Sequence, residues 1–127
     1  MNEIDDVRSF HTAFDLPRPW EPARMAPESM AVRIEALNNV FEYYVTACTT
    51  NRLAGQADAL GALVFLLKSE IVWRGLPWQE LWDDTVEAML KVPPDMHSAR
   101  HKRISDILAR AGYEASLEAQ LPLPLDG

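Results

Sequence analysis

The chain has 127 residues, of which 48% are hydrophobic and four are tryptophan, enough apolar material for a buried core. Its formal net charge of −7 argues against general binding to nucleic-acid backbones or anionic membranes, because both attract an excess of Lys and Arg. The longest apolar stretch, residues 59–67, is too short to cross a bilayer, and one cysteine, Cys48, cannot form an internal disulfide. The sequence therefore predicts a cytoplasmic protein that contacts neither membranes nor DNA directly.

Apolar residues recur at helical spacing along most of the chain, and no stretch alternates as a strand would. The pattern predicts five helices, over residues 4–14, 27–51, 54–73, 78–92 and 98–111. Prolines at four positions from residue 17 to residue 27 exclude a helix there, and Pro93 and Pro94 end the fourth helix. Gly75 ends the third helix, and Gly112 is expected to cap the fifth. The predicted fold class is all-α.

The predicted architecture is a helical bundle over residues 1–114, followed by a flexible tail over residues 115–127. The third helix is apolar almost all round between Leu60 and Leu67, which is more than one face of a helix needs inside a monomer. Such a helix seeks a partner surface, most simply across a two-fold axis. We therefore expect a homodimer.

Two predicted helices carry residues whose spacing places them on one face, since positions three, four and seven apart are neighbours. On the second helix they are Glu35, Asn38, Asn39 and Glu42, and on the third they are Gly55, Asp58 and Ala62. We expect these faces to point inward, where carboxylates from two adjacent helices can hold Mg²⁺, a hard ion that prefers oxygen ligands. The alternative is that Glu42 and Asp58 belong to solvated surface, as single carboxylates on amphipathic helices usually do.

Four segments carry a resemblance to a known family: VRSFHTAFDLPRP, RIEALNNVFEYY, QADALGALVFLL and GLPWQELWDDTVEAMLKV. Over about residues 7–92, the chain resembles the MazG-like, all-α nucleoside triphosphate pyrophosphohydrolases. The ligand pattern of that family is Glu-x-x-Glu, then about a dozen residues, then Glu-x-x-Asp. Laid on this sequence without gaps, the pattern falls on Asn39, Glu42, Gly55 and Asp58.

The resemblance implies Mg²⁺ ions that polarise the phosphates of a nucleotide and generate the attacking hydroxide. Only Glu42 and Asp58 keep a carboxylate from the quartet, and Glu35, one turn before Asn39, could substitute as a ligand. Other family residues are replaced at Asn38, Ala62 and Ala88. Lys91 keeps a family lysine that would contact a nucleotide. The resemblance therefore implies a site that holds Mg²⁺ weakly.

A second resemblance lies in the tail, where Gln120-Leu121-Pro122-Leu123-Pro124-Leu125 is similar to the hexapeptide form of the bacterial sliding-clamp-binding motif. In such motifs the Gln forms hydrogen bonds and the leucines fill an apolar cleft of the partner. The partner-binding residues would then be Gln120, Leu121, Leu123 and Leu125. The alternative is a Leu/Pro strap that folds back on the bundle.

Three smaller features are interpreted as packing or solvation. His11, beside Phe10 and Phe14, is expected to be a packed histidine of the core or of an interface. The three tryptophans of residues 73–82 are expected to serve packing and not base stacking. The basic run over residues 100–103 could touch an acidic partner, but a solvated helix face is the preferred interpretation.

Two functions remain open at this point. In the first, a MazG-like protein with a degenerate site is non-catalytic or weakly catalytic and acts by binding a partner, with the DNA polymerase sliding clamp as the leading candidate. In the second, it is a working Mg²⁺-dependent nucleoside triphosphate pyrophosphohydrolase that removes unwanted nucleotides with Glu35, Glu42 and Asp58.

Overall fold

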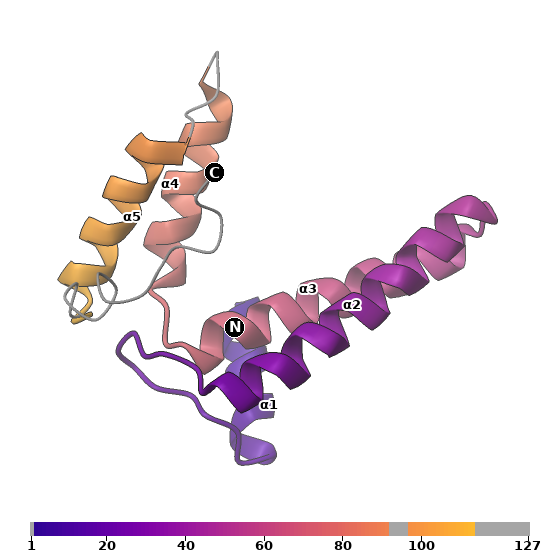
Figure 1. Ribbon diagram of the computed structural model, residues 1–127, viewed down its shortest axis with the longest axis horizontal. Helices are drawn as coiled ribbons and strands as arrows, with labels where there is room; N and C mark the ends of the chain where they lie inside the picture. The colour runs from indigo at the N-terminus through magenta and orange to yellow at the C-terminus, as the bar shows by residue number, and fades with distance from the viewer. Residues whose placement is uncertain (1, 92–96, 114–127) are drawn as a thin grey trace. The chain divides into compact units, whose positions relative to one another are not determined.

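The computed structural model describes residues 2–91 and 97–113, and these residues form five helices and no strand (Figure 1). The helices are α1 (Glu3–Ala13), α2 (Pro27–Thr49), α3 (Leu53–Trp73), α4 (Trp78–Leu90) and α5 (His97–Arg110). The all-α prediction is confirmed, and each predicted helix is present with its ends displaced by at most two residues. Periodicity together with Pro and Gly positions was therefore sufficient to locate the helices.

The chain forms two units, one built on α1, α2 and α3 and the other on α4 and α5. None of the helices in the described part of the chain is long and apolar enough to cross a bilayer. The predicted tail, residues 115–127, lies outside the described residues.

The first helix, α1, begins and ends on local hydrogen bonds. The side chain of Asn2 accepts a hydrogen bond from the backbone N–H of Asp5 at 2.8 Å, which caps the helix start. Acidic residues in the first turn stabilise α1, because their negative charges lie at the positive end of the helix dipole. After the helix, Asp15 adopts a φ of 53°, and the N–H of Leu16 turns back to the carbonyl of His11 at 2.8 Å. The chain leaves α1 in a tight turn that stays close to His11.

Helices α2 and α3 form a long antiparallel hairpin (Figure 1). Pro27 is the first residue of α2, where its missing N–H costs nothing. Asn51 makes the turn with a φ of 54°, a left-handed conformation that Asn tolerates better than most residues. The N–H of Arg52 then donates to the carbonyl of Ala47 at 2.8 Å and closes the turn.

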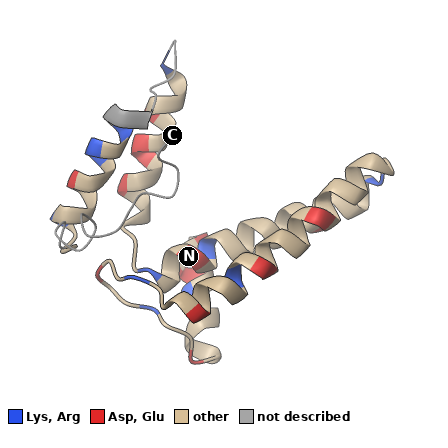
Figure 2. Ribbon diagram, viewed as in Figure 1, with Lys and Arg blue, Asp and Glu red and all other residues tan. Residues whose placement is uncertain are grey.

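The hairpin has a buried face and an exposed apolar face. After the first turns of α2, its buried or half-buried residues recur about every turn, at Arg33, Ala36, Leu37, Val40, Tyr44 and Ala47. A second set of apolar residues stays exposed: Ile34, Phe41 and Val45 on α2, and Leu53, Leu60, Val64 and Leu67 on α3. Because the two helices run antiparallel, helical geometry places both exposed stripes on the same side of the hairpin. We call these seven residues the hairpin apolar surface. Charged residues are few along the two helices of the hairpin (Figure 2).

The second unit is held by charge as well as by apolar packing. On α5, Arg103 Nε donates to Asp84 Oδ1 of α4 at 2.6 Å, and Arg100 Nη2 donates to Thr85 Oγ1 at 3.2 Å. Both arginines are half-buried, so the expectation of a solvated basic run is wrong for them. The reason is that Asp84 and Thr85 of α4 lie opposite these two arginines and accept their hydrogen bonds. Gly112 ends α5 with a φ of 108°, as predicted.

The tryptophans of α4 lie against each other. The ring centroids of Trp78 and Trp82 are 5.7 Å apart with planes inclined by 36°. In the first unit, the Trp73 ring contacts the ring of His11 edge-on at 5.9 Å. These contacts agree with the interpretation of the tryptophans as packing residues.

Candidate functional site

The predicted ligand face of α2 does not point inward within one chain. Glu35, Asn38, Asn39 and Glu42 are all exposed. The least exposed stripe of α2 runs through half-buried Arg33 and Val40 and buried Ala47, and at 100° per residue Glu35 and Glu42 fall on the opposite side of the helix. The expectation failed because α2 has apolar residues on more than one side, so periodicity alone left the buried side ambiguous.

On α3, the matching positions are occupied differently. Asp58 is exposed, and one of its carboxylate oxygens accepts a hydrogen bond from the hydroxyl of Tyr43 at 3.2 Å. Gly55 is buried, and a Cβ added there would lie 3.1 Å from the Cβ of Ala47. The position where the family resemblance expects a carboxylate is therefore a close contact between two helices. A side chain at position 55 would require Ala47 to give way by a few tenths of an ångström.

These residues do not fit a site for several metal ions. Within residues 2–91 and 97–113, no three His, Cys, Asp or Glu side chains come together in a group that could hold a metal ion. Glu35, Glu42 and Asp58 are thus not brought together, whereas Mg²⁺ needs near-octahedral oxygen coordination. Lys91 is exposed at the end of α4, in the second unit. The tail residues Gln120, Leu121, Leu123 and Leu125 lie outside the described residues.

A polar cluster joins α1, α2 and α3, and His11 is the member whose packing the sequence predicts. His11 is fully buried, which confirms the prediction of a packed histidine. Its Nδ1 lies 2.7 Å from the carbonyl oxygen of Pro17, and its Nε2 lies 2.6 Å from Oγ of Ser69 on α3. Because a carbonyl only accepts, Nδ1 carries the proton and Nε2 accepts from the Ser69 hydroxyl.

Arg33 of α2 completes this cluster. Its Nη2 donates to Ser69 Oγ at 2.6 Å, and its Nε donates to Glu70 Oε2 at 2.7 Å. The second oxygen of Glu70 pairs with Arg74 Nη1 at 3.4 Å. The guanidinium of Arg33 also lies over the ring of Trp73, 5.1 Å from its centroid. Each polar group of the cluster thus has a partner, which is what buried polar groups require.

The surroundings of His11 favour its neutral form. Burial is the largest cause that lowers the pKa of His11, and the positive charges of Arg33, Arg8 and Arg18 lower it further. The hydrogen bond to Pro17 acts in the opposite direction but does not outweigh burial. His11 is therefore uncharged near neutral pH.

The hydrogen bond between Ser69 and His11 resembles that between a nucleophilic hydroxyl and its general base, but a substrate cannot reach it. Ser69 is 1% exposed and His11 0%, so no substrate atom reaches the hydroxyl. The cluster is a structural connection among three helices. A sequence signal for it existed, since Ser69 and Glu70 interrupt an otherwise apolar stretch of helix after Lys68.

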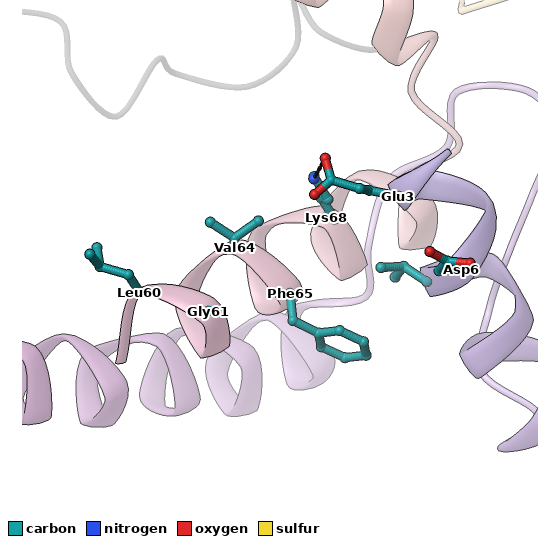
Figure 3. A pocket seen from close by; sticks show the side chains of 8 residues that line it. Glu3, Asp6, Leu60, Gly61, Val64, Phe65 and Lys68 are labelled. Carbon is teal, nitrogen blue, oxygen red and sulfur yellow. Dashed lines mark ion pairs between the residues drawn. The ribbon is translucent and has the colours of Figure 1, made fainter. Parts of the chain in front are cut away.

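A groove between α1 and α3 is the second feature of the first unit (Figure 3). It has a volume of about 480 Å³, and apolar residues, among them Val7 and Phe65, line it. Lys68 Nζ forms an ion pair with Glu3 at 2.6 Å across it. With one rim carboxylate already paired to a lysine, the groove is poorly suited to a cation.

Comparison of the sequence with models of known protein families gave no match, and comparison with curated proteins gave none either. The resemblance to the MazG-like family therefore rests on the residues and spacing described above.

Replacing Ser69 by Ala should lower the free energy of unfolding by about 1–3 kcal/mol, because Nε2 of His11 and Nη2 of Arg33 lose a partner in a buried site. Urea denaturation at a fixed protein concentration, followed by circular dichroism, measures the change. Ser9→Ala is a matched control, since the Ser9 hydroxyl donates to the Asp5 carbonyl on an exposed face, and it should change stability by less than about 0.5 kcal/mol. Equal effects of the two substitutions would show that the cluster does not stabilise the fold.

Proposed function

We propose that this chain is a MazG-like protein with a degenerate active site that is non-catalytic or weakly catalytic and acts by binding a partner. The observation that carries the proposal is the close packing of Gly55 against Ala47, together with the separation of the remaining carboxylates. Pyrophosphate release in the family needs metal ions held by acidic residues of two helices. Here one position has no side chain, and a Cβ added there would lie only 3.1 Å from the Cβ of Ala47.

The remaining donors would suit at most one weakly held ion. Glu35 and Glu42 are exposed on α2, and Asp58 already accepts a hydrogen bond from Tyr43. Two or three dications in one site require several carboxylates to balance their charge, because unbalanced charge is costly to desolvate. The loss of carboxylates at Asn39 and Gly55 removes that balance.

The leading candidate for the partner is the bacterial sliding clamp, bound through the tail. Gln120 would donate and accept hydrogen bonds, and Leu121, Leu123 and Leu125 would fill an apolar cleft. Pro122 and Pro124 pre-set an extended backbone, which lowers the entropy lost on binding. A peptide of this kind works without a catalytic site, so it is compatible with a degenerate one.

We also propose that the protein is a homodimer formed through the hairpin apolar surface. Its members are between 43% and 77% exposed, and apolar side chains of this size gain about 1.5–3 kcal/mol each when fully buried. On α3 the exposed residues Leu53, Leu60, Val64 and Leu67 follow seven-, four- and three-residue steps, the spacing of a seam between packed helices. Two hairpins joined along such seams form a four-helix arrangement.

The first prediction from this proposal is that the purified protein releases little pyrophosphate from nucleoside triphosphates with Mg²⁺ or Mn²⁺, because its carboxylates do not converge. A coupled phosphate assay over the common ribo- and deoxyribonucleotides measures this, with a catalytically competent pyrophosphohydrolase as positive control. Robust turnover that disappears in Glu42→Gln would contradict the proposal and favour the working enzyme.

The second prediction concerns the clamp. Deletion of residues 120–127 should abolish binding to a bacterial sliding clamp, and Gln120→Ala should weaken it by about tenfold or more, which is about 1.4 kcal/mol. Isothermal titration calorimetry measures both, and Gln79→Ala on α4 serves as the matched control, since that side chain bonds only to exposed Asp83 in its own helix. If the full chain binds no clamp, the motif is a coincidence. If the deletion instead lowers the melting temperature, the tail is a packing strap.

The third prediction concerns the homodimer. Leu67→Glu should weaken self-association by about tenfold or more, because it places a charge in the apolar seam. Leu90→Glu is the control, since Leu90 is 75% exposed on α4 and lies outside the hairpin apolar surface. Sedimentation equilibrium at micromolar concentration gives the masses; a wild-type mass equal to one chain would refute the dimer.

A further inference from the structure

We propose that His11 is a proton-sensitive latch, which holds α1 on the α2–α3 hairpin while it is neutral and releases α1 when it is protonated. This inference concerns the buried cluster alone and does not depend on the proposed partner, the dimer or the metal site. It follows from how little else fixes α1 and from the hydrogen bonds that His11 makes.

Few side chains fix α1 to the hairpin. Of its eleven residues only Val7 and His11 are buried. Phe10 packs edge-on against Phe65 of α3, with ring centroids 5.1 Å apart, but stays 36% exposed. Lys68 of α3 pairs with Glu3, whose side chain is 78% exposed, so this ion pair contributes little. His11 is thus a large part of what attaches α1.

The hydrogen bonds of His11 require a neutral ring. Nδ1 donates to the carbonyl of Pro17, and Nε2 accepts from the hydroxyl of Ser69. A proton on Nε2 would turn an acceptor into a donor facing a hydroxyl that already accepts from Arg33. The Ser69 hydrogen would have to find another acceptor, and two cations would then share one oxygen atom.

The charges that face His11 also oppose its protonation. Arg8 lies on its own helix, Arg18 in the following loop and Arg33 on α2, and all three lower the pKa of His11 together with burial. On α3 the facing groups are Ser69 and the Trp73 ring, while the nearby carboxylate of Glu70 is paired with Arg33 and Arg74. Neither ring nitrogen is bonded to a carboxylate, so a positive charge on the ring would have no hydrogen-bonded counter-ion among the described residues.

The direction of the pH dependence follows from these facts. Released His11 returns to water, where its pKa is near the ordinary 6.5, so the released state binds more protons than the docked state. Release is therefore suppressed above about pH 6.5 and increases as pH falls below that value. One proton is taken up, so the opening constant rises by at most about tenfold per pH unit. It levels off once pH falls below the lowered pKa of docked His11.

Release is expected to unwind α1 and to leave the hairpin folded. A helix of eleven residues is shorter than the 12–15 residues at which isolated helices become marginally stable in water. The α2–α3 contact does not need His11, because the ion pair of Arg33 with Glu70 and the apolar packing along the hairpin stay in place. Amide exchange should therefore separate α1 from α2 and α3.

The test is amide hydrogen exchange of the full chain between pH 7.5 and 5.0, corrected for the intrinsic pH dependence of exchange. This range lies above the ordinary titration of Asp and Glu. The opening constant of the α1 amides should rise below pH 6.5, by up to about tenfold per pH unit, while that of the Val40 and Leu66 amides in the hairpin changes much less. His11→Gln should remove this slope, and His101→Gln, an exposed position on α5, should keep it.

Three results would overturn the latch: a flat opening constant for α1, equal slopes in α1 and the hairpin, or a slope that persists in His11→Gln. If His11→Gln does not fold, NMR titration of the His11 ring in the wild-type protein tests the latch instead. A midpoint below 6.5 that falls where the opening constant of α1 levels off supports the latch. A midpoint at 6.5 or above refutes it.

Discussion

The first unit depends on one constraint: a buried histidine and a half-buried arginine lie where three helices meet, and each must find polar partners. His11, Ser69 and Arg33 solve this together, since the Ser69 hydroxyl donates to one and accepts from the other. Two hydrogen bonds of 2.6 Å through one oxygen fix the mutual positions of α1, α2 and α3. A purely apolar contact would tolerate sliding, whereas a satisfied polar network specifies one arrangement.

The same constraint explains the conformation of the loop after α1. The Pro17 carbonyl must reach Nδ1 of His11, and the left-handed turn at Asp15 brings the chain back for it. Arg8 adds a second tie, because its guanidinium donates to the carbonyls of Arg18 and Pro19 at 2.7 and 3.2 Å. Proline nitrogens have no hydrogen to donate. The proline-rich segment is therefore held in place through its carbonyl groups, which accept hydrogen bonds from His11 and Arg8.

The α2–α3 hairpin depends on apolar contacts and not on a polar cluster over most of its length. Its two helices pack closely near the turn, and it carries more apolar residues than it buries. Gly55 allows α3 to approach α2 at Ala47, close to the turn. That approach removes a position where a metal ligand would stand in the resembling family. On the hairpin apolar surface, by contrast, the side chains are not closely packed: Phe41 and Leu60 stay about half exposed and suit contact with another protein surface. Close packing between the helices and apolar exposure on one face are therefore both properties of the same hairpin.

The sequence by itself determined the helices, because periodicity, prolines and glycines act locally: Pro27 begins α2, and Gly112 ends α5. It also identified His11 as a packed residue. It could not decide which side of α2 is buried, since apolar residues surround more than one side of that helix. Nor could it find the partnership of His11 with Ser69, 58 positions apart in the chain. Only tertiary structure makes such pairs, because a buried donor is satisfied by whichever acceptor the packing of distant helices brings within reach.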